Sequence, residues 1–165
     1  MKKNTKRTQN LQIIVDNREQ LPFDFAAFSN VEIIPGTLAA GDYSLPGAEH
    51  LAAIERKTID DLVGCLTKGR DRFERELCKL RPYTLAAIAV EASLEDLARG
   101  RYTSQMQPQA ALQSIIAMQV RYGIPFMFCG NRPGAEYITH GLLSKYHREI
   151  EKQYERICNG TTGDD

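Results

Sequence analysis

Gly41–Asp61 reads GDYSLPGAEHLAAIERKTIDD, in which two short apolar runs are separated by a Pro-Gly loop and followed by a charged segment. The runs Gly41–Leu45 and Leu51–Arg56 flank residues typical of a turn, and this spacing predicts a β-hairpin. Thr58 then supplies an N-cap with Asp61 three residues later, a pattern that opens a helix. The segment therefore predicts a strand–loop–strand–helix unit around which the rest of the chain packs.

Apolar runs and amphipathic stretches alternate on both sides of this unit. The run Thr84–Val90, TLAAIAV, is apolar almost throughout, which is typical of a central strand covered on both faces. Further strands are predicted at 11–15, 31–34 and 124–129, and helices at 58–69, 70–80, 93–100, 108–122 and 133–157. This order predicts an α/β fold with a central mixed sheet and helices on both of its faces.

The composition is that of one globular domain. The chain has 165 residues, of which 42% are hydrophobic, and its 21 Lys and Arg balance its 21 Asp and Glu. No apolar run approaches the roughly 20 residues of a membrane-spanning helix, so no membrane association is expected. The zero net charge argues against indiscriminate nucleic-acid binding, but it permits a local basic patch on a neutral body.

Residues 1–10 are polar, basic and without periodicity, so we expect a disordered basic arm, a single domain at 11–158 and a polar tail at 159–165. The four cysteines form no C-x-x-C pair, which argues against a zinc site or a disulfide framework. We therefore expect reduced and mostly buried thiols in a cytoplasmic protein.

The hairpin brings two acids together if its strands pair in one particular register. Pairing of Leu45 with Ala52 would place Asp42 directly opposite Glu55, with β-carbons about 4.5–5.5 Å apart. Two carboxylates at that distance need a shared proton or a cation, and Mg²⁺ or Mn²⁺ suits an all-oxygen site. A slip of one residue would place the two acids on opposite faces of the sheet.

Side chains alternate along the second hairpin strand, so Glu55 and Lys57 share one face while Ile54 and Arg56 share the other. Asp42, Glu55 and Lys57 can therefore converge on one spot. Two carboxylates for a metal and one ammonium are what phosphodiester hydrolysis requires. The alternative interpretation is an exposed strand end without chemistry.

A second polar cluster, Asp16-Asn17-Arg18-Glu19, follows the first predicted strand. Carboxylates at a strand end can extend a metal site, and a solvated strand-to-loop junction explains them equally well. The same ambiguity holds for Asp61, whose position after Thr58 also fits a purely capping role. Asp60 is expected to be a plain surface acid in the first helical turn.

Basic residues after the hairpin are candidate contacts to nucleic-acid phosphates. Arg70 and Arg72 follow the break at Gly69 and are placed to meet backbone phosphates. Arg75 and Lys79 are expected instead to form i,i+4 ion pairs on a solvated helix.

Four motifs occur in a fixed order, namely IVDNRE at Ile14–Glu19, GDY at Gly41–Tyr43, IERKTIDDL at Ile54–Leu62 and L-x-x-G-R at Leu66–Arg70. Over about residues 11–130 the chain thereby resembles the nuclease domain of the XPF-type structure-specific endonucleases, within the PD-(D/E)XK nucleases. The hallmark of that family is G-D followed by E-R-K-x-x-x-D. The resemblance implies a restriction-endonuclease-like α/β/α sandwich.

The resemblance also implies a site. Its metal ligands would be Asp42, Glu55 and the Arg56 backbone carbonyl, supported by Asp16, with Mg²⁺ or Mn²⁺ as the cation. Lys57 would help to position the attacking water. The full expected set is Asp16, Glu19, Asp42, Glu55, Arg56, Lys57 and Asp61 for catalysis, with Arg18, Arg70 and Arg72 on the DNA.

The expected function is a metal-dependent DNA endonuclease that cuts branched DNA, such as a flap, fork or junction. Nothing after residue 130 resembles the paired helix-hairpin-helix domain that follows in this family, and the architecture suggests a bacterial or viral protein. Expected partners are DNA and a second copy of the chain. Two alternatives stay open, which are a catalytically silent DNA-binding or scaffold module of the same fold and a linear-duplex nuclease of the wider group.

Overall fold

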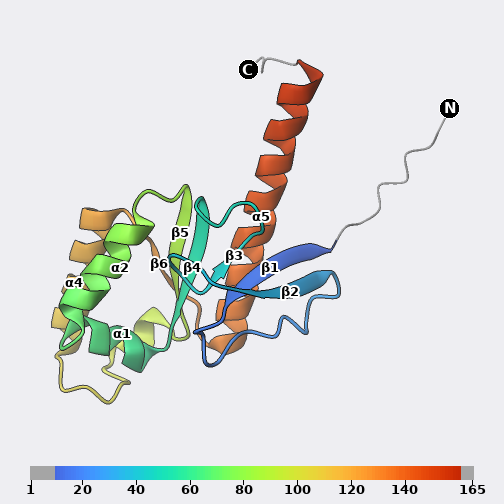
Figure 1. The fold of residues 1–165 in the computed structure, drawn as a ribbon. Helices are drawn as coiled ribbons and strands as arrows, with labels where there is room; N and C mark the ends of the chain where they lie inside the picture. Colours follow the sequence, from blue (N-terminus) through green and yellow to red (C-terminus); the bar gives the residue numbers. More distant parts are fainter. Residues whose placement is uncertain (1–9, 161–165) are drawn as a thin grey trace.

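The computed structural model describes residues 10–160 and places them in one body (Figure 1). Most of the predicted basic arm at 1–10 and of the predicted tail at 159–165 lies outside the described residues. The strands are β1 (Leu11–Asp16), β2 (Val31–Gly36), β3 (Tyr43–Ser44), β4 (Ala52–Lys57), β5 (Leu85–Val90) and β6 (Phe126–Phe128). The helices are α1 (Ile59–Leu66), α2 (Arg70–Leu80), α3 (Leu94–Ala98), α4 (Pro108–Tyr122) and α5 (Arg132–Asn159). This is the element order that the sequence predicts.

The strands form one sheet, mixed as predicted, in the order β2-β1-β3-β4-β5-β6. The pairs β1–β2, β4–β5 and β5–β6 are parallel, whereas β3 runs antiparallel to both β1 and β4. All strands except β3 therefore point the same way, and their carboxyl ends meet at one edge. In open α/β sheets, that edge is where ligands bind.

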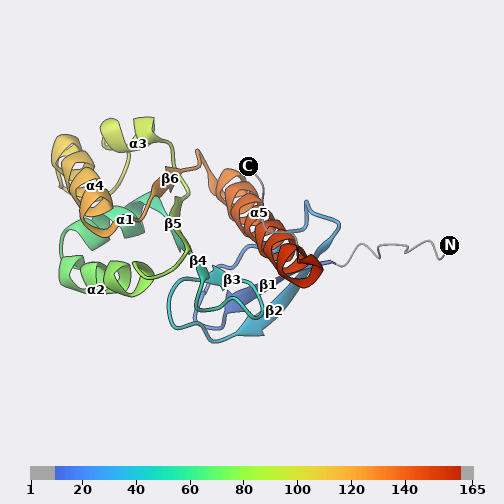
Figure 2. The same ribbon diagram turned by 90° about the horizontal axis from the view of Figure 1, so that it is seen from above.

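The sheet separates two hydrophobic clusters, which gives the predicted three-layer α/β/α sandwich (Figure 2). Helices α1, α2, α3 and α4 cover one face, and α5 crosses the other. The alternation along β4 feeds both layers, because Ala53 packs with the four helices while Ile54 packs on the α5 side. Phe23 and Phe25, from the segment between β1 and β2, complete the α5 side.

The hairpin has the predicted register but a shorter first strand. Tyr43 pairs with Ile54, which belongs to the register that also aligns Leu45 with Ala52. The prediction of a strand over Gly41–Leu45 is wrong at both ends, since β3 contains only Tyr43 and Ser44. The hydroxyl of Ser44 donates to the Ala52 carbonyl at 2.6 Å, so a side-chain hydrogen bond links the strands where the backbone ladder stops.

The expectation of mostly buried thiols is wrong. All four cysteines are free, but only Cys65 is buried, while Cys78 and Cys158 are exposed. Cys78 lies on α2 between the buried positions of an amphipathic helix, so its side chain faces solvent. Among the described residues, no helix combines the length and apolar character needed to cross a membrane.

Two glycines of α5 offer a matched test of its packing. A β-carbon on Gly134 would lie 2.0 Å from the Cys129 carbonyl oxygen, whereas one on Gly141 would meet nothing within 4 Å. We expect Gly134→Ala to lower the free energy of unfolding by about 3 kcal/mol, because backbone must move to admit the methyl group. Gly141→Ala should raise it by about 0.5–1 kcal/mol through helix propensity. Chemical denaturation measures both, and equal effects of the two substitutions would contradict this packing.

Candidate active site

A cleft of about 1080 Å³ lies at the carboxyl edge of the sheet. Its walls come from the ends of β1 and β4, the segment before β3, and helices α1 and α2. The acidic side chains in its lining are Asp16, Glu19, Asp42, Glu55, Asp60, Asp61 and Glu76. Every acid that the sequence predicts for the site therefore reaches this one cleft.

Asp42 is held against β4 by a turn that requires glycine. Gly41 has φ +75°, and a β-carbon there would lie 2.9 Å from the Ala53 β-carbon. This close approach lets the Asp42 amide donate to the Ile54 carbonyl at 2.9 Å. Asp42 Oδ2 in turn accepts from the Arg56 amide at 2.8 Å. The Gly-Asp pair thus fixes one carboxylate on the end of the neighbouring strand.

The Asp42 carboxyl carries the clearest electrostatic sign of a site. Burial and then the negative charge of Glu55 raise the pKa of Asp42 from 3.8 to about 7, against a lowering by the Arg56 amide. Two acids that repel each other in a cleft match the crowding that the hairpin register predicts. An arrangement that disfavours its own charge is typical of a functional site.

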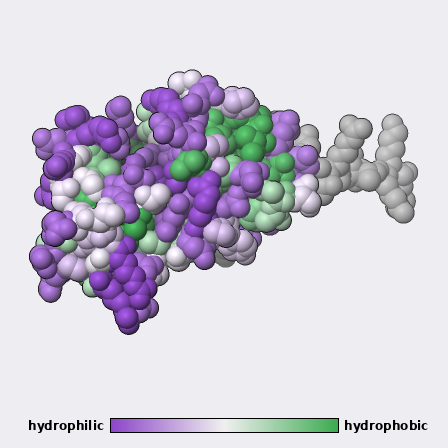
Figure 3. Space-filling model, turned by 90° about the horizontal axis from the view of Figure 1, so that it is seen from below, coloured by the Kyte–Doolittle hydropathy of each residue, from purple (hydrophilic) through white to green (hydrophobic). Residues whose placement is uncertain are grey.

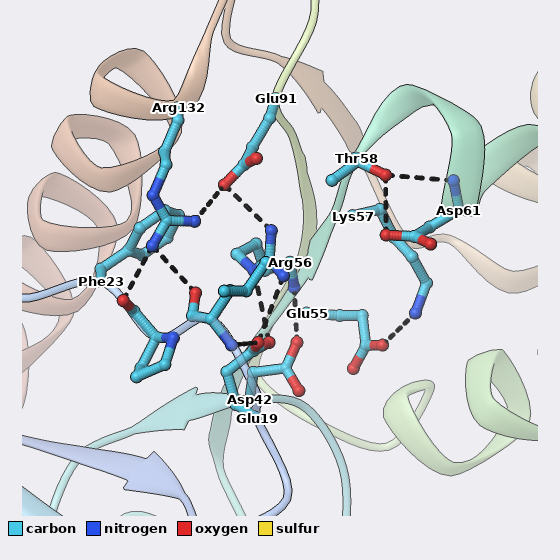
Figure 4. A network of polar contacts seen from close by, with 12 residues as sticks. Glu19, Phe23, Asp42, Glu55, Arg56, Lys57, Thr58, Asp61, Glu91 and Arg132 are labelled. Carbon is cyan, nitrogen blue, oxygen red and sulfur yellow. Dashed lines mark hydrogen bonds and ion pairs between the residues drawn. The ribbon is translucent and has the colours of Figure 1, made fainter. Parts of the chain in front are cut away.

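Glu55 forms an ion pair with Lys57 on the cleft side of β4 (Figure 4). Both side chains are largely shielded from solvent, and the Lys57 ammonium lies 5.7 Å from the centre of the Phe73 ring on α2. Burial would lower the pKa of Lys57, but the charge of Glu55 and its hydrogen bond raise it above its ordinary value. Lys57 is therefore an ammonium at neutral pH.

Arg56 points to the opposite face and binds two glutamates (Figure 4). Its guanidinium lies 3.2 Å from Glu19 and 3.0 Å from Glu91, and all three side chains are at most 10% exposed. Glu91 also accepts from Arg132 of α5 at 2.8 Å. Arg132 also donates to the Leu21 carbonyl at 2.9 Å, so this polar network joins α5 to the segment that follows β1.

Asp16 is fully engaged within the protein. Its Oδ1 accepts from the Arg18 amide at 2.9 Å and from Arg18 Nε at 2.7 Å, and its Oδ2 accepts from Arg18 Nη2 at 3.0 Å and from the Leu38 amide at 2.6 Å. The Arg18 hydrogen bond is the main cause that lowers the pKa of Asp16 to about 2. A carboxylate has about four acceptor positions, so this arrangement leaves none for the metal that the sequence reading assigned to Asp16.

The two acids at the start of α1 have local partners. Asp61 closes the predicted cap, because its amide donates to Thr58 Oγ1 at 3.1 Å and its carboxylate accepts from that hydroxyl at 2.7 Å. Asp60 is not the plain surface acid that was expected. It accepts from the amide and the hydroxyl of Thr103, which lower its pKa and tie the loop before α4 to the mouth of the cleft.

The ion pairs of α2 differ from the prediction. Arg70 pairs with Glu74 at 3.0 Å and Arg72 with Glu76 at 3.6 Å, both in i,i+4 spacing. Arg75 and Lys79, which were expected to form such pairs, have no ion pair among residues 10–160. Arg70 and Arg72 each have a glutamate four positions later, whereas the residue four after Arg75 is Lys79, and Asp71, one turn before Arg75, forms no ion pair with it.

A family model for the ERCC4 domain matches residues 15–142, which run from the end of β1 into the first half of α5. The chain belongs to the ERCC4 domain family. This membership confirms the XPF-type nuclease domain that the motif order predicts. No curated protein matches the chain.

Two solved structures share the fold of this ERCC4 domain. XPF from Aeropyrum pernix matches with a TM-score of 0.66 and 24% identity over 93% of this chain and 75% of that chain. XPF from Aeropyrum pernix in complex with DNA matches with a TM-score of 0.65 and 24% identity over 85% of this chain and 66% of that chain. The α/β/α architecture is thus that of an XPF nuclease domain.

Two residues of this ERCC4 domain escaped the sequence analysis although they touch site residues. Glu91 and Arg132 bind each other, and Glu91 binds Arg56. A usable signal existed for Glu91, since it follows β5 directly, at the edge where ligands bind in such sheets. No sequence signal indicates Arg132, because only the packing of α5 brings it within reach of Glu91.

The raised pKa of Asp42 predicts a pH-dependent stability for the metal-free protein. Its pKa is about 7 in the folded chain against 3.8 when exposed, so this group costs no stability below about pH 4. The penalty grows as pH rises to about 7 and is complete above it. At pH 8 in a chelator, Asp42→Asn should raise the free energy of unfolding by about 1–3 kcal/mol, with no gain at pH 4. The control Glu49→Gln, on an exposed loop, should leave the free energy of unfolding unchanged at both pH values. A stability gain in D42N that does not vary with pH would contradict the repulsion between Asp42 and Glu55.

The buried charge network predicts an asymmetry between two glutamates. Glu91→Gln should lower the free energy of unfolding by about 1–3 kcal/mol, because the buried Arg56 guanidinium loses an anion. Glu95 pairs with Arg99 at 2.7 Å, but both side chains are at least 60% exposed. Glu95→Gln should therefore change stability by less than about 0.5 kcal/mol. Thermal and urea unfolding distinguish the two variants, and similar losses would rule out a structural role specific to Glu91.

Proposed function

We propose that this ERCC4 domain is a divalent-metal-dependent DNA endonuclease that hydrolyses phosphodiester bonds in branched DNA. The observation that carries the proposal is the mutual repulsion of Asp42 and Glu55 at the floor of a cleft with a fixed ammonium beside them. Such a pair is unfavourable without a counter-charge, and a hard divalent cation supplies one.

The donor set fits Mg²⁺ or Mn²⁺. Residues 10–160 hold no group of three or more His, Cys, Asp or Glu arranged around one metal position. Mg²⁺ is usually held by one or two carboxylates, with substrate phosphate and water completing its shell, so Asp42 and Glu55 suffice as protein acids. The predicted Arg56 backbone carbonyl remains the proposed further ligand. When bound, the cation would supply positive charge against the phosphate and the attacking water.

The protein groups have separate tasks in this proposal. Lys57 stays protonated, so it donates to the nucleophile or to a phosphate oxygen and stabilises developing negative charge rather than removing a proton. Arg56, locked by Glu19 and Glu91, holds the strand that presents Glu55 and Lys57. Asp16 holds Arg18 and the Leu38 amide, so it shapes the far wall of the cleft as a positioning residue.

Branched DNA is the proposed substrate. Family membership and the likeness to an XPF nuclease that was solved with DNA support a nucleic-acid substrate. The cleft is open and carries Lys and Arg side chains beside its acids, and such cations attract a polyanionic substrate. A second copy of the chain remains the proposed protein partner.

Purified protein tests the activity directly. With Mg²⁺ or Mn²⁺, the native chain should nick fluorescently labelled flap and fork DNA faster than linear duplex of the same sequence. Asp42→Asn should lower the rate at least about 100-fold, since several kcal/mol of charge stabilisation depend on this carboxylate. Calorimetry with Mn²⁺ alone should detect binding to the native chain and a strong loss in D42N. The exposed control Glu49→Gln should behave as the native chain in both measurements.

The outcomes separate the alternatives. Mn²⁺ binding and DNA binding without nicking would support a silent binding module. Equal or faster cleavage of linear duplex would support a linear-duplex nuclease of the wider group. Nicking by D42N at the native rate would show that the catalytic site lies elsewhere.

A further inference from the structure

The cleft has one acidic floor and one basic wall. Lys68, Arg72 and Lys79, which we call the cation row, line it from the α2 side. Lys68 lies just before α2, Arg72 in its first turn and Lys79 in its last. Seven residues separate Arg72 from Lys79, which places them on one helix face about 10 Å apart along the axis. The row therefore runs the length of α2 beside the acids.

The two lysines of this row are free to bind an anion. Within residues 10–160, neither Lys68 nor Lys79 takes part in an ion pair, and both are exposed. Arg72 is held only loosely, at 3.6 Å from Glu76, and its side chain is 72% exposed. The other cations of the cleft are committed, because Arg18 is bound to Asp16, Arg56 to Glu19 and Glu91, and Lys57 to Glu55.

The cleft offers no aromatic side chain on which a base can stack. Its lining contains charged and polar side chains, alanine, glycine, Cys65 and Leu80, but no Phe, Tyr, Trp or His. Proteins that hold single strands through their bases rely on aromatic side chains. Figure 3 shows that the half of the molecule with helices α1 to α4 is largely hydrophilic from below, while hydrophobic surface gathers toward the N-terminal trace. The lysine and arginine side chains of the cleft are instead suited to the phosphates of a nucleic acid.

We propose that the cation row is the track for the DNA strand that carries the scissile bond. It binds backbone phosphates next to the acidic floor without contacting bases, and it offsets the repulsion between that floor and a polyanion. Lys68 and Lys79 are the principal contacts, whereas the sequence predicted Arg18, Arg70 and Arg72 as the DNA contacts. This inference rests on the proposed nuclease function and specifies where the substrate lies.

Salt-dependent binding tests the track in the inactive D42N chain. The probe is a fluorescein-labelled DNA duplex with a single-stranded arm, followed by fluorescence anisotropy over a range of KCl concentrations. Each lost phosphate contact lowers the slope of log K against log salt by about 0.9 for duplex DNA and by about 0.7 for a single strand. Lys68→Gln with Lys79→Gln should therefore lower the slope by about 1.4–1.8 and weaken binding about 10-fold per lysine at 0.1 M salt. In the active chain, the same double variant should raise KM and leave kcat within about twofold.

Arg75→Gln is the matched control, since Arg75 is an exposed cation on the same helix that does not line the cleft. It should leave the slope and the affinity unchanged. A second probe with an abasic single-stranded arm should show the same loss for the lysine double variant, because the row contacts no bases. The track alone would be overturned if the lysine double variant keeps the native slope, or if Arg75→Gln lowers the slope equally. A lysine effect that vanishes on the abasic arm would overturn it as well. Failure of the D42N chain to bind either probe would overturn the track together with the proposed substrate.

Discussion

Strand β4 ends with three charged residues whose side chains alternate across the sheet. Glu55 and Lys57 face the cleft beneath α1 and α2, while Arg56 is buried on the α5 side between Glu19 and Glu91. These faces cannot be set independently, because a shift of one residue would invert all three. Such a shift would bury Glu55 and Lys57 where Arg56 now lies, and it would separate Arg56 from its two glutamates. A buried charge without its partner costs several kcal/mol, so the network and the register enforce each other.

The same network makes the layer opposite the cleft part of the site. Arg132 opens α5, and it binds Glu91 and the Leu21 and Pro22 carbonyls, with its guanidinium 4.9 Å from the centre of the Phe23 ring. Through Glu91 and Arg56, the start of a helix on one face of the sheet is linked to the carboxylates on the other. The far end of α5 projects beyond the sheet (Figure 1), and the helix joins this network through its first residue, Arg132.

The cleft keeps an electrostatic arrangement that folding alone would not select. Asp42 is held by the turn at Gly41 and by the Arg56 amide at a place where its own charge is disfavoured. Several contacts of the surrounding sheet hold the Asp42 carboxylate in this position. Strained or repulsive groups persist at functional sites when the structure around them holds them in this way. The cations beside it divide into those consumed by structural pairs, such as Arg18 and Arg56, and those exposed along α2. The exposed cations can therefore be replaced without breaking a buried ion pair.

The sequence by itself determined the order of the elements, the cap at Thr58 and the sharing of one face by Glu55 and Lys57, because periodicity and capping are local properties of the chain. The motif order was likewise enough to indicate the ERCC4 domain. Only the tertiary structure decided that Asp16 is occupied by Arg18 and Leu38, and that Glu91 and Arg132 join Arg56. Those contacts connect residues far apart in the chain, 41 positions for Glu91 and Arg132, and depend on how α5 packs on the sheet. Whether a basic residue is paired or free has the same origin, since it depends on which acids the fold brings within reach.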